Sequence, residues 1–232
     1  MSSVGVVIAA GGRGKRLGGK IPKQFLRLDG VSILQRTVEA FASERSVDEI
    51  VIASAPEHIR KVERLLAGIG CRKHLTIVPG GKERQDSVWN GMHGFLSTPD
   101  IVIVHDAARP LITRKVIRSV IHAARTYGAA VVGVKLNDTI KVEGKKGFYT
   151  HTLDRSKLWA VQTPQGFRFD FLLKAHRAAR RSRYLGTDEA SLVERLKIPV
   201  RIVEGDRMNM KITAPTDLKL AGMWLKSNRF KR

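Results

Sequence analysis

Short runs of valine, isoleucine and alanine recur along the chain, and this recurrence constrains the fold more than any other feature. The runs predict strands at Val4–Ala9, Ile50–Ser54, Leu75–Val78, Ile101–His105 and Ala129–Val134. Between them, apolar residues fall three or four positions apart, which is the spacing of an amphipathic helix. Strands that are apolar on both faces and alternate with helices predict a parallel sheet covered by helices on both sides.

This pattern predicts an α/β protein with a single Rossmann-like domain over residues 1–232 and a mostly parallel central sheet. Further helices are expected at 59–69, at 116–124 with Thr113 as N-cap, at 168–183, at 188–196, and from Pro215 to Trp224. The alternation breaks at about 138–158, where "TIKVEGKKGFYTHTL" indicates two short strands around a Gly-Lys-Lys-Gly turn. Because an isolated hairpin is marginal in water, this arm is expected to pack on something, such as a second subunit.

The charge balance points to anionic partners. The chain has 42 Lys and Arg against 21 Asp and Glu, a formal net charge of +21. The basic clusters lack the interleaved aromatic residues that stack on bases, so nucleic acid is an unlikely partner. No apolar run approaches the roughly 18 residues of a membrane span. A lone cysteine, Cys71, excludes an internal disulfide and suits a reducing compartment, so we expect a cytoplasmic protein with no membrane partner.

A glycine-rich basic loop, "AAGGRGKRLGGKIPKQF" at residues 9–25, follows the first predicted strand. It begins like the dinucleotide fingerprint GxGxxG, but Leu17 stands where the third glycine belongs. It also approaches the P-loop GxxxxGK[ST], but Ile21 replaces the hydroxyl residue and Pro22 disfavours a helix there. What remains is a backbone-lined phosphate cradle, with Arg16 and Lys23 able to reach phosphoryl oxygens.

Five further segments decide between such a cradle and a simple solvated turn. They are "VPGGKERQDSV", "IVIVHDAARP", "LWAVQTPQGF", "GTDEASLVE" and "VEGDRMNMKIT". Together with the glycine-rich loop, and in this order from Val6 to about Leu218, they resemble the 2-C-methyl-D-erythritol 4-phosphate cytidylyltransferase family of the non-mevalonate isoprenoid pathway. The resemblance implies transfer of CMP from CTP to methylerythritol 4-phosphate, with release of pyrophosphate. It also implies Mg²⁺ or another divalent cation as cofactor.

The resemblance implies roles for the nucleotide-binding half of the site. Arg16 and Lys23 would be the catalytic residues, stabilising charge on the α-phosphate and the departing pyrophosphate. Gly81 and Ser87 would read the cytosine, whereas Arg84 and Asp86 could equally form a local ion pair that holds their loop. The nucleotide would be lined by the backbone of Ala9, Ala10, Gly11 and Gly12.

The acceptor half is implied in the same way. Asp106 would hold the metal or accept hydroxyl groups; sequence leaves both open. His105 is interpreted as a packed strand-end histidine. The other implied substrate-binding residues are Arg109, Thr139, Arg155, Thr187 and Lys211, of which Thr187 also fits a helix N-cap. In the family the arm crosses to its neighbour, so a homodimer is expected.

Three alternatives remain at this point. A ribitol-5-phosphate cytidylyltransferase would share the glycine-rich loop and differ in the acceptor pocket, around Asp138, Thr139, Arg155 and Lys211. A sugar-1-phosphate nucleotidylyltransferase would open with a similar loop but with longer sugar-binding segments. A basic RNA- or membrane-binding protein with a vestigial nucleotide fold would explain the charge of +21.

Overall fold

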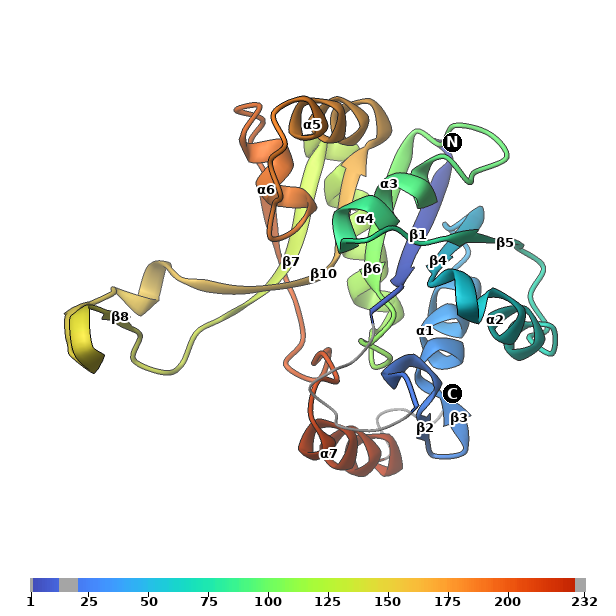
Figure 1. Cartoon of the computed structure of the whole chain (residues 1–232), viewed down its shortest axis with the longest axis horizontal. Helices are drawn as coiled ribbons and strands as arrows, with labels where there is room; N and C mark the ends of the chain where they lie inside the picture. The colour runs from blue at the N-terminus through green and yellow to red at the C-terminus, as the bar shows by residue number, and fades with distance from the viewer. Residues whose placement is uncertain (1, 13–20, 228–232) are drawn as a thin grey trace.

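A seven-stranded sheet forms the centre of the computed structural model, which describes residues 2–12 and 21–227 (Figure 1). The strand order is β11-β7-β10-β6-β1-β4-β5. The strands are β1 (Val4–Ala10), β4 (Glu49–Ser54), β5 (His74–Pro79), β6 (Ile101–Asp106), β7 (Ala129–Lys135), β10 (Trp159–Arg168) and β11 (Arg201–Glu204). The five strands expected from the sequence are therefore present, each within one residue of its predicted ends.

The sheet is mostly parallel, as predicted, and β10 is the strand that runs the other way. It pairs antiparallel with both β6 and β7, whereas β1 pairs in parallel with β4 and β6. Sequence reasoning missed β10 because its Pro164 argues against a central strand. The structure accommodates this proline at a shift of register between Gln162 and Gln165, where the ladder with β7 is interrupted.

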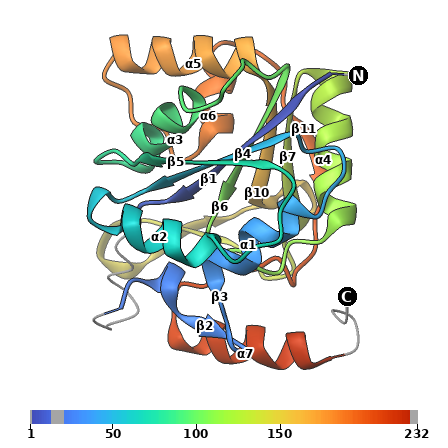
Figure 2. The ribbon, with the colours of Figure 1, turned by 90° about the vertical axis from the view of Figure 1, so that its right-hand side faces the viewer.

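Helices cover both faces of the sheet, as Figure 2 shows edge-on. One face packs against α1 (Ile33–Ala42), α2 (Ile59–Leu66) and α4 (Arg114–Tyr127). The opposite face packs against α3 (Arg84–Met92), α5 (Phe169–Arg181) and α6 (Glu189–Glu194). Sheet residues alternate between the two cores: Val6 and Ile8 belong to the first, and Val7 to the second.

The ends of α4 illustrate how local sequence sets a helix boundary. The Thr113 side chain accepts a hydrogen bond from the Val116 backbone N–H, which confirms the predicted N-cap. At the other end Gly128 has a φ of 83°, a left-handed conformation that glycine adopts at little cost.

A third, smaller hydrophobic core lies where α7 (Pro215–Lys226) packs beside the short strands β2 (Arg27–Leu28) and β3 (Val31–Ser32). Pro215 is the first residue of α7, as predicted. This core is built from Leu28, Ile33, Leu111, Ile212 and Ala221. It connects the segment after the glycine-rich loop to the C-terminal helix.

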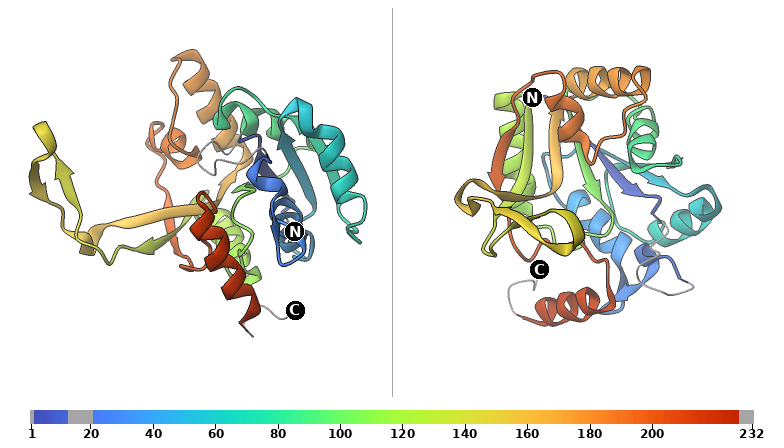
Figure 3. Two further views of the ribbon diagram at one scale, coloured as in Figure 1. Left: turned by 60° about the horizontal axis from the view of Figure 1, so that its bottom comes forward. Right: turned by 60° about the vertical axis from the view of Figure 1, so that its left-hand side comes forward.

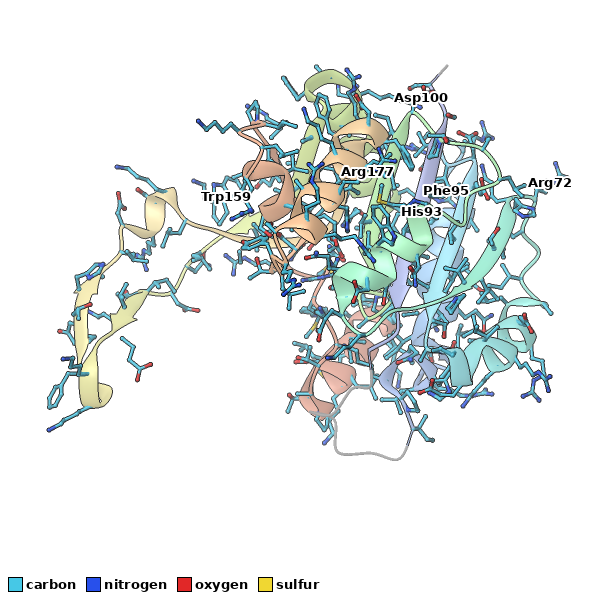
Figure 4. The ribbon with its side chains drawn as sticks, turned by 45° about the horizontal axis from the view of Figure 1, so that its top comes forward. Arg72, His93, Phe95, Asp100, Trp159 and Arg177 are labelled. Carbon is cyan, nitrogen blue, oxygen red and sulfur yellow. The ribbon has the colours of Figure 1, made fainter. Side chains whose placement is uncertain are left out.

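The predicted hairpin is present and projects from the body (Figures 1 and 3). It consists of β8 (Lys141–Glu143), a turn at 145–147 and β9 (Tyr149–Thr152), and Trp159 marks where the chain re-enters the sheet (Figure 4). At its tip Phe148 is 75% exposed and Tyr149 is 62% exposed. Use of the arm in dimerisation remains a prediction. Among the described helices, none combines the length and apolarity needed to cross a membrane.

One buried side chain of the helical layer, on α5, is titratable and does not line the pocket at the ends of β1, β4 and β6. His176 on α5 is fully buried, and neither ring nitrogen has a hydrogen-bond partner among the described residues. Its ring lies 6.0 Å from that of Trp89 on α3, and Arg180, Arg84, Asp86 and His93 are the charged or titratable groups around it. Burial and the nearby arginines lower the pKa of His176 to about 4.

We expect His176 to make the protein acid-sensitive. Its pKa is lower in the folded than in the unfolded state, so the unfolded chain binds the extra proton and stability falls as the pH drops from about 6.5 to about 4. Between pH 7 and pH 5 this loss should be about 2 kcal/mol. Urea unfolding should therefore show a smaller pH effect in His176→Leu than in the wild type. His122→Gln, on the exposed face of α4, serves as control; an unchanged pH effect in His176→Leu would contradict the expectation.

Candidate active site

A pocket of about 760 Å³ opens at the carboxyl ends of β1, β4 and β6. From β1 the chain passes to β4 on one side, and β6 lies on the other side, so the pocket lies where the strand order reverses. Open α/β sheets bind ligands at such switch points. The pocket is lined by Ala9, Ala10, Gly11, Gly12, Lys23, Gln24, Ala55, Pro56, Glu57, Gly81, Lys82, Glu83, Arg84, Ser87, Asp106, Ala107, Ala108 and Lys211.

The end of β1 forms one wall of the pocket, and Gln24 holds Lys23 against it. The Gln24 side chain is buried, and its Nε2 donates a hydrogen bond of 3.0 Å to the Ala10 carbonyl. This contact fixes the short helix at Lys23–Phe25, and Lys23 Cε then lies 4.0 Å from where a Cβ on Gly12 would be. The backbone of residues 9–12 and the Lys23 side chain therefore share one wall. Arg16 lies outside the described residues.

The loop between β5 and α3 forms a second wall, and its shape depends on Gly81 and Ser87. The Gly81 N–H donates to Ser87 Oγ at 3.1 Å, and the Ser87 hydroxyl donates to the Glu83 carbonyl at 3.1 Å. A Cβ on Gly81 would lie 2.2 Å from the Cβ of Asp86, so no other residue fits there without moving the loop. Ser87 thus organises the backbone of this wall from a buried position.

Three cations surround the carboxylate of Asp106, the last residue of β6. Arg84 Nε lies 2.9 Å from Oδ1, Lys211 Nζ lies 2.7 Å from Oδ2, and Arg109 Nε lies 3.9 Å from Oδ2. Burial opposes the charged form of Asp106, but the charges of Arg84 and Lys211 outweigh it and hold its pKa well below the ordinary value. Asp106 is therefore ionised at neutral pH.

Arg84 connects the pocket to α6, and here the structure corrects an expectation. A local ion pair between Arg84 and Asp86 was considered from the sequence, but Arg84 pairs with Asp106 and, through Nη1, with Glu189 Oε2 at 2.5 Å. Asp86 instead accepts a hydrogen bond from the Glu83 N–H and lies 3.7 Å from Arg180. Arg84 lies in the first turn of α3, and its side chain reaches partners on β6 and α6.

His105 is a packed histidine, as interpreted from the sequence. Its Nε2 lies 3.1 Å from the Arg109 carbonyl, so it donates there, and Nδ1 lies 3.1 Å from Thr163 Oγ1. Burial lowers its pKa to about 3, which keeps the ring neutral. Thr163 Oγ1 also accepts from the Asp106 N–H at 3.1 Å. β10 thus supports the backbone that carries Asp106.

Some expected residues lie away from this pocket. Arg109 stands behind Asp106 and donates from Nη1 to the Asn209 carbonyl at 2.7 Å. Thr139 and Arg155 are exposed on the arm, where Arg155 bonds to the Asn137 carbonyl. Thr187 is exposed before α6, and the N-cap of that helix is Asp188, not Thr187.

Sequence reasoning missed three residues that shape the pocket. Gln24, Thr163 and Glu189 belong to the segments "PKQF", "TPQGF" and "GTDEAS", so their neighbourhood was recognised although their roles were not. Each acts by contacting a residue distant in the chain: Ala10, His105 and Arg84 respectively. Only the polar residue type in an otherwise packed segment could have signalled them.

The pocket fits a divalent cation that is shared with a ligand. The described residues hold no group of three or more His, Cys, Asp or Glu side chains that could enclose a metal. Asp106 offers a single ionised carboxylate, and both its oxygens contact cations. Mg²⁺ is commonly bound by one or two carboxylates together with substrate phosphates, so this donor set suits Mg²⁺ on a polyphosphate.

Comparison with known proteins identifies the family. A family model described as "IspD: 2-C-methyl-D-erythritol 4-phosphate cytidylyltransferase" matches residues 4–227. The 2-C-methyl-D-erythritol 4-phosphate cytidylyltransferase of Symbiobacterium thermophilum is 50% identical, over 96% of this chain and 92% of the relative. That of Pelotomaculum thermopropionicum is 44% identical over 99% of this chain and 97% of the relative.

The crystal structure of the 2-C-methyl-D-erythritol 4-phosphate cytidylyltransferase from Thermus thermophilus superposes with a TM-score of 0.77, at 34% identity, over 96% of this chain and 98% of that one. Sequence, family model and fold agree over nearly the full length. The chain therefore belongs to the 2-C-methyl-D-erythritol 4-phosphate cytidylyltransferase family, nucleotidyltransferases of the non-mevalonate route to isoprenoid precursors.

Proposed function

We propose that the pocket at the ends of β1, β4 and β6 binds CTP and transfers its CMP group to 2-C-methyl-D-erythritol 4-phosphate. The observation that carries this proposal is the joint presence of a glycine-lined wall with Lys23 and the cationic cluster around Asp106 in one pocket. Two polyanions must meet in this reaction. A pocket with backbone N–H groups on one side and Lys and Arg on the other suits that requirement.

The nucleotide occupies the half of the pocket between β1 and α3. Its cytosine faces the Gly81–Ser87 wall, where Ser87 and Asp86 closely confine the backbone of Gly81. Its triphosphate lies along Ala9, Ala10, Gly11 and Gly12 beside Lys23. A bound Mg²⁺ would neutralise charge on the triphosphate, and Asp106 would be its protein ligand, together with phosphate oxygens.

The chemistry requires charge stabilisation and no strong base. An oxygen of the acceptor's 4-phosphate attacks the α-phosphorus of CTP, the bond from this phosphorus to the bridging oxygen breaks, and pyrophosphate leaves with that electron pair. The attacking oxygen is already anionic. Lys23 and Arg16 hold the charge that accumulates on the α-phosphate and the leaving group. His105 is buried and neutral, and takes no proton.

The acceptor occupies the other half, next to Lys211, with Arg109 behind Asp106. Thr139 and Arg155 lie on the arm, outside the pocket lining of their own chain, and Thr187 precedes α6, also outside that lining. We propose that the chain forms a homodimer in which each arm brings Thr139 and Arg155 to the neighbour's acceptor site. The exposed Phe148 and Tyr149 at the arm tip favour such a contact.

We further propose that residues 1–232 act as one nucleotidyltransferase domain. We also propose that the protein works in the cytoplasm, where CTP is available. The positive charge is explained without nucleic acid, because both substrates are anions.

Pyrophosphate release tests the assignment directly. With CTP and Mg²⁺, we expect turnover with methylerythritol 4-phosphate and little with ribitol 5-phosphate. Arg16→Ala and Lys23→Ala should each lower kcat by about 10²–10³, the usual effect of removing one donor to the transition state. Lys115→Ala, on the exposed surface of α4, should leave kcat unchanged. Preference for ribitol phosphate would move the assignment to that enzyme, and no turnover with either acceptor would refute it.

The cytosine wall can be tested at Gly81. Gly81→Ala places a methyl group 2.2 Å from the Cβ of Asp86, so the loop must move. Its contacts with the pyrimidine are then displaced as well. We expect the KM for CTP to rise about tenfold or more, equivalent to about 1.4 kcal/mol of binding. Gly68→Ala has open space around it and is the matched control. A normal KM for CTP in Gly81→Ala would place the base elsewhere.

Mixing inactive variants tests whether the arm is shared. Arg155→Ala removes an arm residue, and Lys23→Ala removes a pocket residue of the main body. If the arm serves the neighbour, a heterodimer of the two variants has one intact site. An equal mixture, refolded together, should regain about a quarter of wild-type kcat/KM by random pairing. Activity no higher than that of the separate variants would show that each chain uses its own arm.

A further inference from the structure

Arg84 joins two buried carboxylates that belong to different parts of the fold. Its Nε lies 2.9 Å from Asp106 Oδ1 on β6, and its Nη1 lies 2.5 Å from Glu189 Oε2 on α6. Only Asp106 and Arg84 of the three residues line the pocket. Glu189 is 1% exposed, so it cannot touch a substrate. Whatever Glu189 does for the reaction passes through Arg84.

Glu189 is itself held firmly by its surroundings. Gln165 on β10 is buried, accepts a hydrogen bond of 3.1 Å from the Ala190 N–H, and donates one of 2.7 Å to Asp188 Oδ2. Asp188 also caps α6 through the Ser191 N–H at 2.9 Å. The start of α6 is therefore tied to the central sheet on both sides of Glu189, which makes its carboxylate a fixed anchor for Arg84.

The two oxygens of Asp106 have different partners as a result. Oδ1 contacts Arg84, whose other end is anchored by Glu189. Oδ2 contacts Lys211, whose side chain is 35% exposed and lines the pocket. A flexible lysine is a point charge that can turn to a phosphate, whereas an arginine held at two nitrogens loses both contacts when it moves. Oδ2 is the oxygen whose partner can change.

We propose that Glu189 is a positioning residue of the transfer reaction: it retains Arg84 on Asp106 Oδ1 when anionic substrates enter, so that only Lys211 exchanges Asp106 Oδ2 for a substrate phosphate. This inference rests on the proposed function. Without the Glu189 charge, Arg84 is a pocket-lining cation close to a triphosphate. It would leave Asp106 for the phosphates, bind CTP in its ground state and leave Asp106 misplaced.

The predicted signature is a separation of kcat from KM. Glu189→Gln keeps the size and the hydrogen-bonding capacity of the side chain but removes its charge. We expect kcat for pyrophosphate release to fall tenfold or more, while the KM for CTP stays within twofold of the wild-type value or decreases. Glu194→Gln, which removes an exposed carboxylate from the last turn of the same helix, should change neither constant. Loss of packing alone would raise KM or lower the melting temperature without this separation.

A double-mutant cycle with Arg84→Gln shows whether Glu189 acts through Arg84. In that background Glu189→Gln should lower kcat no further, because the residue it positions is gone. The double variant also leaves no unpaired buried charge, so it should fold even if Glu189→Gln alone does not. An equal, additive loss of kcat in both backgrounds, or a wild-type kcat in Glu189→Gln, would overturn the inference.

A measurement without turnover separates this inference from the proposed function. In ¹⁵N-arginine-labelled protein, the Arg84 Nε–H resonance, identified by its loss in Arg84→Gln, should exchange slowly with water in the wild type. On addition of Mg²⁺ and CTP it should stay protected in the wild type and lose protection in Glu189→Gln. Equal protection in both proteins would refute the anchoring role, whether or not methylerythritol phosphate is the acceptor; an inactive wild type would refute the proposed function alone.

Discussion

The parallel register of β1 with its two neighbours determines where everything else in the site can be. Ala9 on β1 lies opposite Ala53 on β4 and opposite Asp106 on β6, so three strands end at the same level. The glycine-rich loop leaves β1 at this edge, and the loop with Gly81 and Ser87 arrives there from β5. Because the side chains of both sheet faces are packed against helices, this edge is where backbone and charge can face a ligand.

Charge is concentrated at that edge in an ordered way. One buried carboxylate, Asp106, contacts Arg84 and Lys211 and lies within 3.9 Å of Arg109. A second, Glu189, balances Arg84 from a position that no substrate reaches. A site for two polyanions needs cations, but cationic side chains without acidic partners repel one another and move apart. The two acids keep them in place until the substrates bring their own negative charge.

The sequence predicted most of the fold and the outline of the site. Five strands, the N-terminal boundaries of α4 and α7 and the protruding hairpin followed from the apolar periodicity, the capping residues and the turn residues. The pocket brings together nine of the expected residues: Ala9, Ala10, Gly11, Gly12, Lys23, Gly81, Ser87, Asp106 and Lys211. The antiparallel β10 was missed, because a proline that normally excludes a central strand is accommodated at a register shift.

Residue type and order along the chain determined the fold class and the family, because the periodic pattern and the motif segments are properties of neighbouring residues. The partners of Arg84 were decided by tertiary structure alone. Asp86, two residues away, was one of two partners in an ion pair that the sequence left open, but a helix directs residues at i and i+2 to different faces. Asp106 and Glu189 lie 22 and 105 residues further along the chain and meet Arg84 only because β6 and α6 flank the first turn of α3. Long-range ion pairs of this kind depend on how elements pack, and packing is absent from any local pattern.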